Sequence, residues 1–202
     1  IGGESTRPGA ETVSEDVEIQ RVEPVIAALH QELPTPISID TRKAAVAEAA
    51  FKAGAAMLND VAALSFDAQL ASVAAARGVP VCLMHAQGDP KTMQASPRYD
   101  DVLLDVYDFL EARIAVAVAA GIDRAQILVD PGIGFGKTLE HNLALLRGLS
   151  LFHGLGCPIL IGASRKRFIG TLSGAGAPDS RMPGSVAVAL AAVAQGVQIV
   201  RV

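Results

Sequence analysis

Short apolar runs rich in Val, Ile and Leu recur along the chain, and they are continuous rather than alternating with polar residues. They read "PISID", "AAMLND", "VPVCLMH", "QILVDPG", "CPILIGAS" and "VQIVRV". A continuous apolar run is typical of a strand that is covered on both faces, as in a parallel sheet. The pattern therefore predicts a parallel sheet buried between other elements.

Stretches with helical spacing of apolar residues separate these runs. They lie at 14–33, 41–52, 67–77, 100–120, 139–149, 165–172 and 184–195. Gly54, Gly78 and Gly121 follow three of these stretches, at the position where glycine commonly ends a helix. Thr12 and Glu15 have the spacing of a capping box before the first helix.

The alternation of strands and helices fits either an open doubly wound sheet or a closed (β/α)8 TIM barrel. The barrel fits the count better if its first strand is missing and its last is truncated. The chain opens on "IGGEST" with no strand before it, and it closes on "GVQIVRV" inside an apolar run. We expect residues 1–202 to form a single α/β domain.

Composition and charge exclude several classes of protein. Half of the 202 residues are hydrophobic and only 4% are aromatic, as expected for a sheet covered by helices of small residues. The net charge of −4 argues against a nucleic-acid partner. No apolar run approaches the roughly 18 residues needed to cross a bilayer, so we expect no membrane association. Cys82 and Cys157 lie in or beside apolar runs, and we expect both to be reduced and buried in a cytoplasmic protein.

Polar side chains end the predicted strands. Asp40, Asn59, His85 and Asp130 each close an apolar run, and Arg201 lies in the last one. Because the carboxyl ends of parallel strands form the ligand-binding face of α/β folds, these side chains are expected to meet in one cavity. The alternative is that Asp40 and Asn59 cap the helices that follow them. Asp130 does not fit that alternative, because a proline and a glycine loop follow it.

The loop "DPGIGFGKT" at 130–138 looks at first like a phosphate cradle. In a Walker A loop a glycine precedes Gly136 by five positions, but Pro131 stands there. The dinucleotide fingerprint needs a glycine where Lys137 stands. Both templates fail, so the glycines predict a loop that bends tightly beside a ligand, with Asp130 facing that ligand.

The motifs "GGESTRPGA", "SIDTRKA", "LNDV", "MHAQGDPKTMQ", "DPGIGFGKTLEHNLALL", "GASRKRFIG" and "GVQIVRV", in this order, resemble those of the dihydropteroate synthase family. The resemblance implies a (β/α)8 barrel and a transferase of folate biosynthesis. Members of this family join p-aminobenzoate to 6-hydroxymethyl-7,8-dihydropterin pyrophosphate, giving 7,8-dihydropteroate and pyrophosphate. It also implies these two small-molecule substrates, Mg²⁺ as cofactor, and a homodimer.

The resemblance also implies roles for individual residues. The pterin pocket corresponds to Asp40, Asn59, Asp130 and Lys166, with Phe135 packed nearby. Thr6, Arg7 and Pro8 correspond to a loop that covers p-aminobenzoate, where Arg167 replaces a serine found in many members. Pyrophosphate is bound by Thr6, Arg7 and Arg201, and we expect backbone N–H groups near Ser164 and Arg165 to contribute. Lys166, Asp40 and Arg201 are the residues expected to act in catalysis.

Some family features lie outside the chain. The asparagine that contacts Mg²⁺ belongs to the first strand, so no metal ligand is expected within these residues, and a histidine would follow Arg201 by two positions. We therefore expect that this chain by itself can lack activity. Two alternatives stay open: a homologue that binds pterin without catalysis, and a pterin-binding methyltransferase of the corrinoid type.

Overall fold

The computed structural model describes residues 1–7, 9–88 and 96–202. Four parallel strands pair in the order of the sequence: β1 (Ser38–Asp40), β2 (Met57–Asp60), β3 (Val81–Met84) and β4 (Ile127–Asp130). A second parallel pair, β5 (Leu160–Ile161) and β6 (Ile199–Val200), continues the series, because Val129 of β4 bridges Ile159 in parallel. At the other edge Gly2 bridges Asp40, also in parallel.

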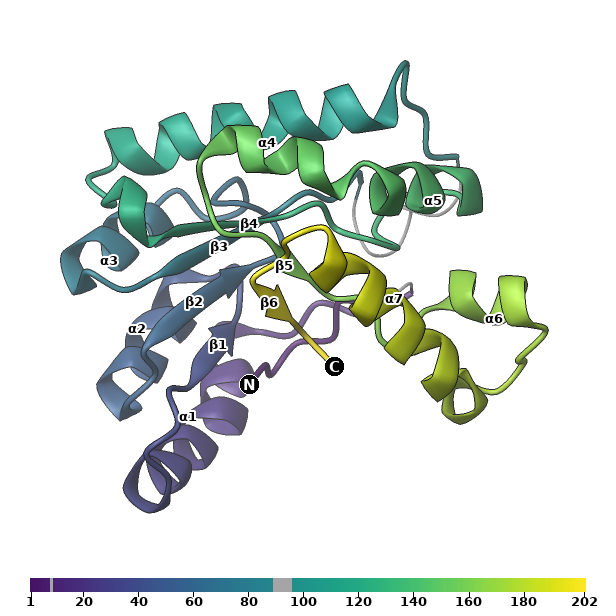
Figure 1. Cartoon of the computed structure of the whole chain (residues 1–202). Coiled ribbons are helices and arrows are strands. Elements are labelled where there is room, and N and C mark those ends of the chain that lie inside the picture. The colour runs from purple at the N-terminus through teal and green to yellow at the C-terminus, as the bar shows by residue number, and fades with distance from the viewer. Residues whose placement is uncertain (8, 89–95) are drawn as a thin grey trace.

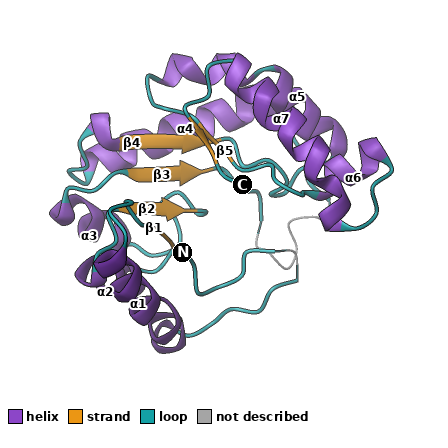
Figure 2. Ribbon diagram, turned by 60° about the horizontal axis from the view of Figure 1, so that its bottom comes forward, coloured by secondary structure: helices purple, strands orange, loops and turns teal. Residues whose placement is uncertain are grey.

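This strand order decides between the two predicted architectures. A doubly wound sheet reverses its strand order at a switch point. Among the described strands the order never reverses, and each strand lies beside its neighbour in sequence. The series follows the order of a (β/α)8 barrel, and Figure 2 shows the strands side by side with the helices outside them.

Helices connect successive strands and cover the outer face of the sheet (Figure 1). The α-helices are α1 (Glu15–Glu32), α2 (Ala44–Ala53), α3 (Leu70–Arg77), α4 (Val102–Ala119), α5 (Leu139–Arg147), α6 (Arg167–Ser173) and α7 (Met182–Ala194). Short 3-10 turns are η1 (Arg124–Gln126), η2 (Leu149–Leu155) and η3 (Pro178–Arg181). Gly54 and Gly78 end α2 and α3 in the left-handed conformation, as the sequence predicts.

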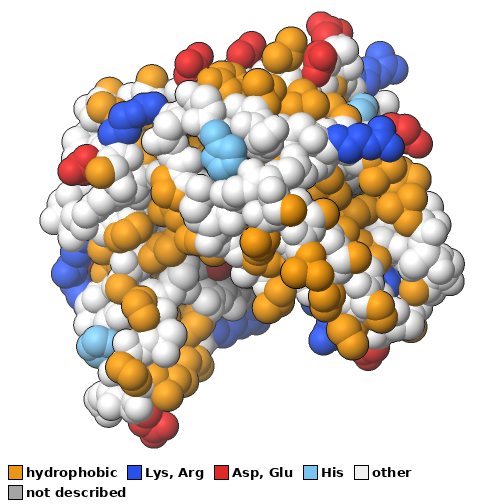
Figure 3. Space-filling view, viewed as in Figure 1, with side chains coloured by type: hydrophobic (Ala, Val, Ile, Leu, Met, Phe, Trp, Pro, Cys, Tyr) orange, Lys and Arg blue, Asp and Glu red, His pale blue; other side chains and the backbone are white. Residues whose placement is uncertain are grey.

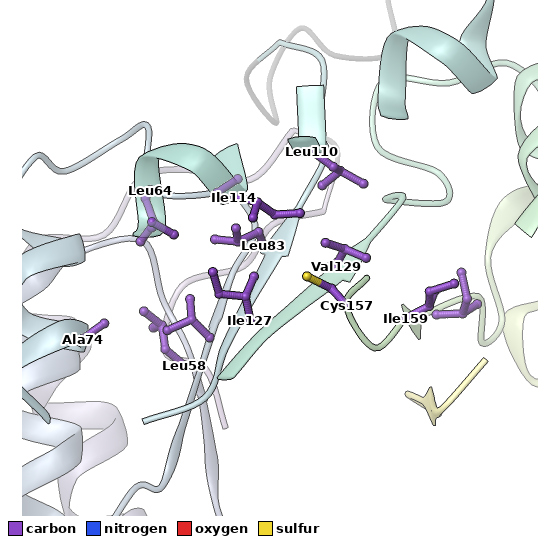
Figure 4. Close-up of a cluster of buried hydrophobic side chains, with 14 of the residues drawn as sticks. Leu58, Leu64, Ala74, Leu83, Leu110, Ile114, Ile127, Val129, Cys157 and Ile159 are labelled. Carbon is purple, nitrogen blue, oxygen red and sulfur yellow. The ribbon is translucent and has the colours of Figure 1, made fainter. Parts of the chain in front are cut away.

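Two hydrophobic clusters lie on opposite faces of the strands. The larger cluster packs the outer face against the helices; Figure 4 shows Leu58, Leu83, Ile127 and Val129 of the strands against Ile114 of α4 and other helical residues. The smaller cluster joins Cys82, Leu128 and Leu160, with Met57 and Ile199 packed against it. Because successive strand residues point to opposite faces, this second cluster fills the inner side of the curved sheet.

The inner face changes character along the strands. Its apolar residues, such as Cys82 and Leu128, lie toward the amino ends of the strands. Two positions further along the same face come polar residues, among them Asp40, Asp130 and Arg201. The inner face is therefore apolar toward the amino ends of the strands and polar toward their carboxyl ends. We call this polar end of the inner face the mouth.

Two local predictions need correction. No capping box forms at α1, because Ser14 is its N-cap and makes no side-chain capping bond. The helix expected at 165–172 begins two residues later, because Arg165 takes the left-handed conformation (φ 55°) and Lys166 is the N-cap of α6.

Both cysteines are free and buried, as predicted. In the part of the chain that the structure describes, no helix combines the length and the apolar character that a bilayer crossing requires.

Candidate active site

Polar side chains from neighbouring strands meet at the mouth of the curved sheet. The register pairs Asp40 of β1 with Asn59 of β2, and Met84 of β3 with Asp130 of β4. Asn59 and Asp130 are therefore two strands and two residues apart, roughly 12 Å between Cα atoms from strand spacings. Neither Asp40 nor Asn59 caps a helix, since Lys43 and Gln69 are the N-caps of α2 and α3.

Asp40 contacts two of the other predicted site residues. The Arg201 guanidinium lies 2.9 Å from Asp40 Oδ2, and the Asn59 side chain hydrogen-bonds the same carboxylate. Burial raises the pKa of Asp40 above its usual value, although Arg201 and Asn59 both oppose the shift. The ion pair links β1 to the segment after β6, so it spans the mouth.

Asp130 and Lys166 form a second charged pair in the same mouth. Burial raises the pKa of Asp130, and the positive charge of Lys166 and the N–H of Gly132, 2.7 Å from Asp130 Oδ1, only partly reverse the shift. Burial also lowers the pKa of Lys166 to about 8, despite the nearby charge of Asp130. Lys166 Nζ donates to the carbonyl of Ile133 and lies 4.5 Å from the centre of the Phe135 ring. Phe135 and Lys166 are thus neighbours, as the resemblance implies.

The glycine loop after β4 packs tightly on the loop after β3. Gly132 and Gly136 both have positive φ, 70° and 62°. A Cβ at Gly132 would overlap the carbonyl oxygen of His85, and one at Gly136 would overlap that of Gln87. The glycines therefore serve close backbone approach beside Asp130, which agrees with the prediction that this loop is not a nucleotide cradle.

A buried lysine in this loop is a feature that sequence reasoning missed. Lys137 Nζ lies 2.8 Å from His85 Nδ1 and donates to the carbonyl of Phe135 at 3.0 Å. Burial lowers the pKa of Lys137 to about 7, and burial next to Lys137 lowers that of His85 to about 3. His85 also packs edge-on against Phe109 of α4, and its contact with Lys137 joins the two loops.

Asp60, at the end of β2, is another buried residue that sequence reasoning missed. Its two carboxylate oxygens accept the N–H groups of Ala62 and Leu64, at 2.8 and 2.6 Å. Burial raises its pKa to about 6 despite these bonds. Asp60 follows Asn59 in the strand and therefore points to the opposite face, toward the helices. It fixes the turn after β2 and is not part of the mouth.

Among the described residues, no hydrogen bond or ion pair connects the remaining predicted substrate residues to the mouth. Thr6 is half-buried and Arg7 is exposed, in the segment that follows the Gly2 bridge to Asp40. Pro8 lies outside the described residues. Arg167 is exposed at the start of α6.

The backbone anion site expected near Ser164 and Arg165 is not formed as predicted. The N–H of Arg165 donates to Ser185 Oγ at 2.9 Å, and the N–H of Lys166 donates to the carbonyl of Ala163. These donors are therefore already used inside the chain, and an anion at this position needs side-chain cations instead.

The described residues do not build a metal site of their own. Within them, no group of three His, Cys, Asp or Glu side chains is placed to hold a metal ion. At the mouth, Asp40 already pairs with Arg201, and Asp130 accepts the N–H of Gly132. This donor set does not fit a Mg²⁺ ion, and no chemical step below depends on one.

Comparisons with known proteins place this chain among pterin enzymes. The family model described as pterin binding enzyme matches residues 1–202. The dihydropteroate synthase of Escherichia coli (strain K12) is 48% identical over 202 residues, which cover 100% of this chain and 71% of that protein.

Solved structures agree with the sequence match. The dihydropteroate synthase of Xanthomonas albilineans with 4-aminobenzoic acid has a TM-score of 0.94 at 46% identity, covering 100% of this chain and 71% of that one. The same enzyme in complex with 7,8-dihydropteroate has a TM-score of 0.88 at 44% identity, covering 96% of this chain and 70% of that one. The fold is therefore that of a (β/α)8 barrel, as predicted, and the chain belongs to the pterin-binding enzyme family.

Proposed function

We propose that this protein is a dihydropteroate synthase, a transferase of folate biosynthesis. It joins p-aminobenzoate to 6-hydroxymethyl-7,8-dihydropterin pyrophosphate and releases pyrophosphate and 7,8-dihydropteroate. The names of its relatives support this function, as does the complex of a structural relative with 7,8-dihydropteroate. The chain spans about 71% of the length of the Escherichia coli relative.

The observation that carries the proposal is the pair of buried carboxylates at the strand ends. Asp40 and Asp130 both have raised pKa values because burial outweighs the cations beside them. A pterin presents an amino group and a ring N–H side by side, which one carboxylate accepts as a bidentate pair. We assign that role to Asp130, and we assign the remaining polar edge of the ring to Asn59 and Asp40.

The reaction then needs charge placement rather than a side-chain nucleophile. Pyrophosphate departs with the electrons of the carbon–oxygen bond and leaves a cationic pterin methylene. The nitrogen of p-aminobenzoate attacks this carbon and loses a proton. The Asp40 carboxylate stabilises the developing cation, Lys166 closes the pocket beside Phe135, and Arg201 binds the departing anion.

The ion pair between Arg201 and Asp40 gives the site a way to respond to substrate. Arg201 is 60% exposed, so its guanidinium can turn toward a pyrophosphate without leaving a buried cavity. Asp40, which is 13% exposed, then faces the pterin without its cation. The positive charge that forms on the pterin takes the place of the guanidinium beside Asp40, so the carboxylate acts most strongly as the leaving group departs.

Thr6, Arg7 and Pro8 complete the proposed site from the segment before α1, and Arg167 completes it from α6. We assign p-aminobenzoate to these residues, with Thr6 and Arg7 also contacting pyrophosphate. The complex of a structural relative with 4-aminobenzoic acid supports a site for this substrate in the family. Mg²⁺ remains the proposed cofactor, held by groups other than the described residues.

We also propose that residues 1–202 belong to one domain of a cytoplasmic homodimer. The single family match over the whole chain supports one domain, and the free, buried cysteines fit a reducing compartment.

The exposed apolar side of α7 supports the homodimer. Met182, Val186 and Leu190 expose 58%, 49% and 65% of their surface along this side. Figure 3 shows hydrophobic side chains gathered over this helix, which supports association of two copies. Light scattering of the full protein, with Val186→Glu as the disrupting variant, tests the dimer.

Asp130→Asn tests the proposed function. The amide turns an –NH₂ donor toward the donors of the pterin, so we expect pterin affinity to fall about 10- to 100-fold in a calorimetric titration. Pteroate formation should fall with it. Asp108→Asn is the matched control, because Asp108 is exposed on α4. Unchanged pterin affinity in Asp130→Asn contradicts the assignment.

The same assays separate the two alternatives. A pterin-binding methyltransferase would transfer the methyl group of methyltetrahydrofolate and form no pteroate from p-aminobenzoate. A homologue without catalysis would bind pterin in the calorimeter and give neither product. Pteroate formation by the full protein supports the synthase over both.

A further inference from the structure

A buried cluster of charged side chains lies beside the segment that carries Thr6 and Arg7. We call Glu4, Glu18, Arg42 and Lys43 the anchor cluster. Lys43 Nζ lies 2.7 Å from Glu4 Oε2 and 2.6 Å from Glu18 Oε2, and Arg42 Nη2 lies 2.8 Å from Glu4 Oε1. The side chains of Lys43 and Glu18 are only 5% and 1% exposed.

The anchor cluster fixes both ends of one loop. Glu4 lies at the start of this loop and Val13 lies at its end. Glu4 Oε2 accepts the N–H of Val13 at 2.9 Å, and Lys43 Nζ donates to the carbonyl of Val13 at 2.5 Å. One lysine thus contacts the residues on both sides of the segment 5–12, and Figure 1 shows the purple N-terminal chain extending away from β1 before it returns to α1.

The residues between the two fixed ends are held only by local bonds. In 5–7 and 9–12, the part of this segment that the structure describes, the N–H of Arg7 donates to Ser5 Oγ, and that of Ala10 to the carbonyl of Arg7. No ion pair involves the Arg7 guanidinium within the described chain. The loop is therefore fixed at both ends, and Thr6 and Arg7, which lie between them, can contact a ligand.

The charges of the anchor cluster satisfy one another. Burial alone lowers the pKa of Lys43, but its bonds to Glu18 and Glu4 outweigh burial, and the pKa is raised. Burial alone raises the pKa of Glu4, but Lys43, the N–H of Val13 and Arg42 outweigh it, and the pKa is lowered. Lys43 and Glu4 thus keep their charges in the folded protein.

We propose that Lys43 and Glu4 are positioning residues for p-aminobenzoate: they hold the ends of the loop so that Thr6 and Arg7 are presented to the second substrate. This inference rests on the proposed synthase function. Neither residue touches substrate. They act by restricting the loop before substrate binds, so that Thr6 and Arg7 lose less conformational freedom when p-aminobenzoate binds.

The proposal predicts a split between the two substrates. The pterin pocket uses Asp40, Asn59 and Asp130, which are not in the loop, so its affinity should not depend on the anchor. Lys43→Met and Glu4→Gln should raise the KM for p-aminobenzoate about tenfold, corresponding to the ordering of one or two side chains. Affinity for a pterin that lacks the pyrophosphate, a ligand that Thr6 and Arg7 do not contact, should stay within about twofold of wild type when measured by calorimetry.

Matched controls come from a surface pair of the same two residue types. Lys52 Nζ lies 2.9 Å from Glu48 Oε1 on α2, and the two side chains are 63% and 50% exposed. Lys52→Met and Glu48→Gln remove the same groups without touching the loop, so they should leave both substrate constants unchanged. Glu4→Gln keeps the shape of the side chain, which makes it informative even if Lys43→Met does not fold.

Hydrogen exchange supplies a readout that needs no activity. Backbone amides at 5–13 should exchange faster in Lys43→Met and Glu4→Gln than in wild type, whereas amides of β2 and β3 should not change. In the double variant the effects on KM should be less than multiplicative, because both substitutions remove the same anchor.

The possible failures are distinguishable. If the full protein, with the segments that flank residues 1–202 in its relatives, forms no pteroate, the proposed function is wrong, whatever the exchange data show. If wild type is active but both variants keep the wild-type KM and the wild-type exchange at 5–13, the positioning role is refuted. Equal losses of pterin and p-aminobenzoate binding would also refute it, since they indicate general loss of structure.

Discussion

Buried charged side chains occupy two regions of this molecule, and folding shifts their pKa values in opposite senses: toward the charged form in one region and toward the neutral form in the other. In the anchor cluster the pKa of Lys43 is raised and that of Glu4 is lowered, so folding favours both charges. At the strand ends the pKa of Asp130 is raised and that of Lys166 is lowered to about 8, so folding disfavours both. The two regions are joined through β1, which carries Asp40 at its end and leads within three residues to Lys43.

This difference separates structure from chemistry. A buried charge that is fully paired contributes to holding the chain together, and its partners come from the protein. A buried charge that remains underpaired lowers stability, and it is retained where a ligand supplies the missing partner. Asp130 and Lys166 are of the second kind. The comparison therefore predicts that substitutions at the strand ends lower kcat, whereas substitutions in the anchor cluster lower stability and raise the KM for p-aminobenzoate.

Lys166→Met should give the largest effect. Removing a cation beside the reacting pterin should lower kcat about 10²- to 10³-fold, the usual loss for one electrostatic contact in a transition state. Stability in urea should not fall, because the folded state no longer holds an unfavourable buried charge. Lys52→Met, on the surface of α2, serves as control for both measurements. A stable, fully active Lys166→Met protein would remove the distinction between the two regions.

Glu18→Ala should give the next largest effect, on stability. It leaves Lys43 without one of its two carboxylates and Thr41 Oγ1 without the acceptor 2.9 Å away. We expect a loss of about 3 kcal/mol in the free energy of unfolding, the lower end of the range for breaking a buried pair. Glu48→Ala, which breaks an exposed pair, should leave the free energy of unfolding nearly unchanged. Similar losses in the two variants would mean that the anchor cluster contributes no more than a surface pair.

Much of the fold could be predicted from the sequence because the pattern of each element is local. Every strand of the structure falls within a predicted apolar run, and helix ends such as Gly54 and Gly78 carry their own signal. Asp40, Asn59 and Asp130 were found because each ends an apolar run, and parallel strands end at the same edge of a sheet.

Two of the contacts that sequence reasoning missed join residues that are far apart in the chain. Lys43 lies 39 positions after Glu4, and Lys137 lies 52 positions after His85, so no spacing rule joins them. In the sequence, Lys137 belongs to a loop that fits neither phosphate-binding template, and the loop carries no other signal for the burial of this lysine. The start of α6 was misplaced because the left-handed conformation of Arg165 has no sequence signal of the kind that glycine gives.

The smallest effect expected is a change in the pH dependence of stability, and it tests Lys137. Its pKa is lowered from 10.5 to about 7 by burial, so between these values the unfolded chain binds more protons than the folded one. Lys137 should therefore contribute a rise in stability of about 2 kcal/mol from pH 7 to pH 9, in addition to a smaller rise from Lys166. Lys137→Met should lose the contribution of Lys137 while keeping most of the packing. His85, with a pKa of about 3, stays neutral in the folded state throughout this interval. If urea unfolding shows the same pH dependence in wild type and variant, Lys137 carries its charge in the folded protein and belongs with the satisfied charges of the anchor cluster.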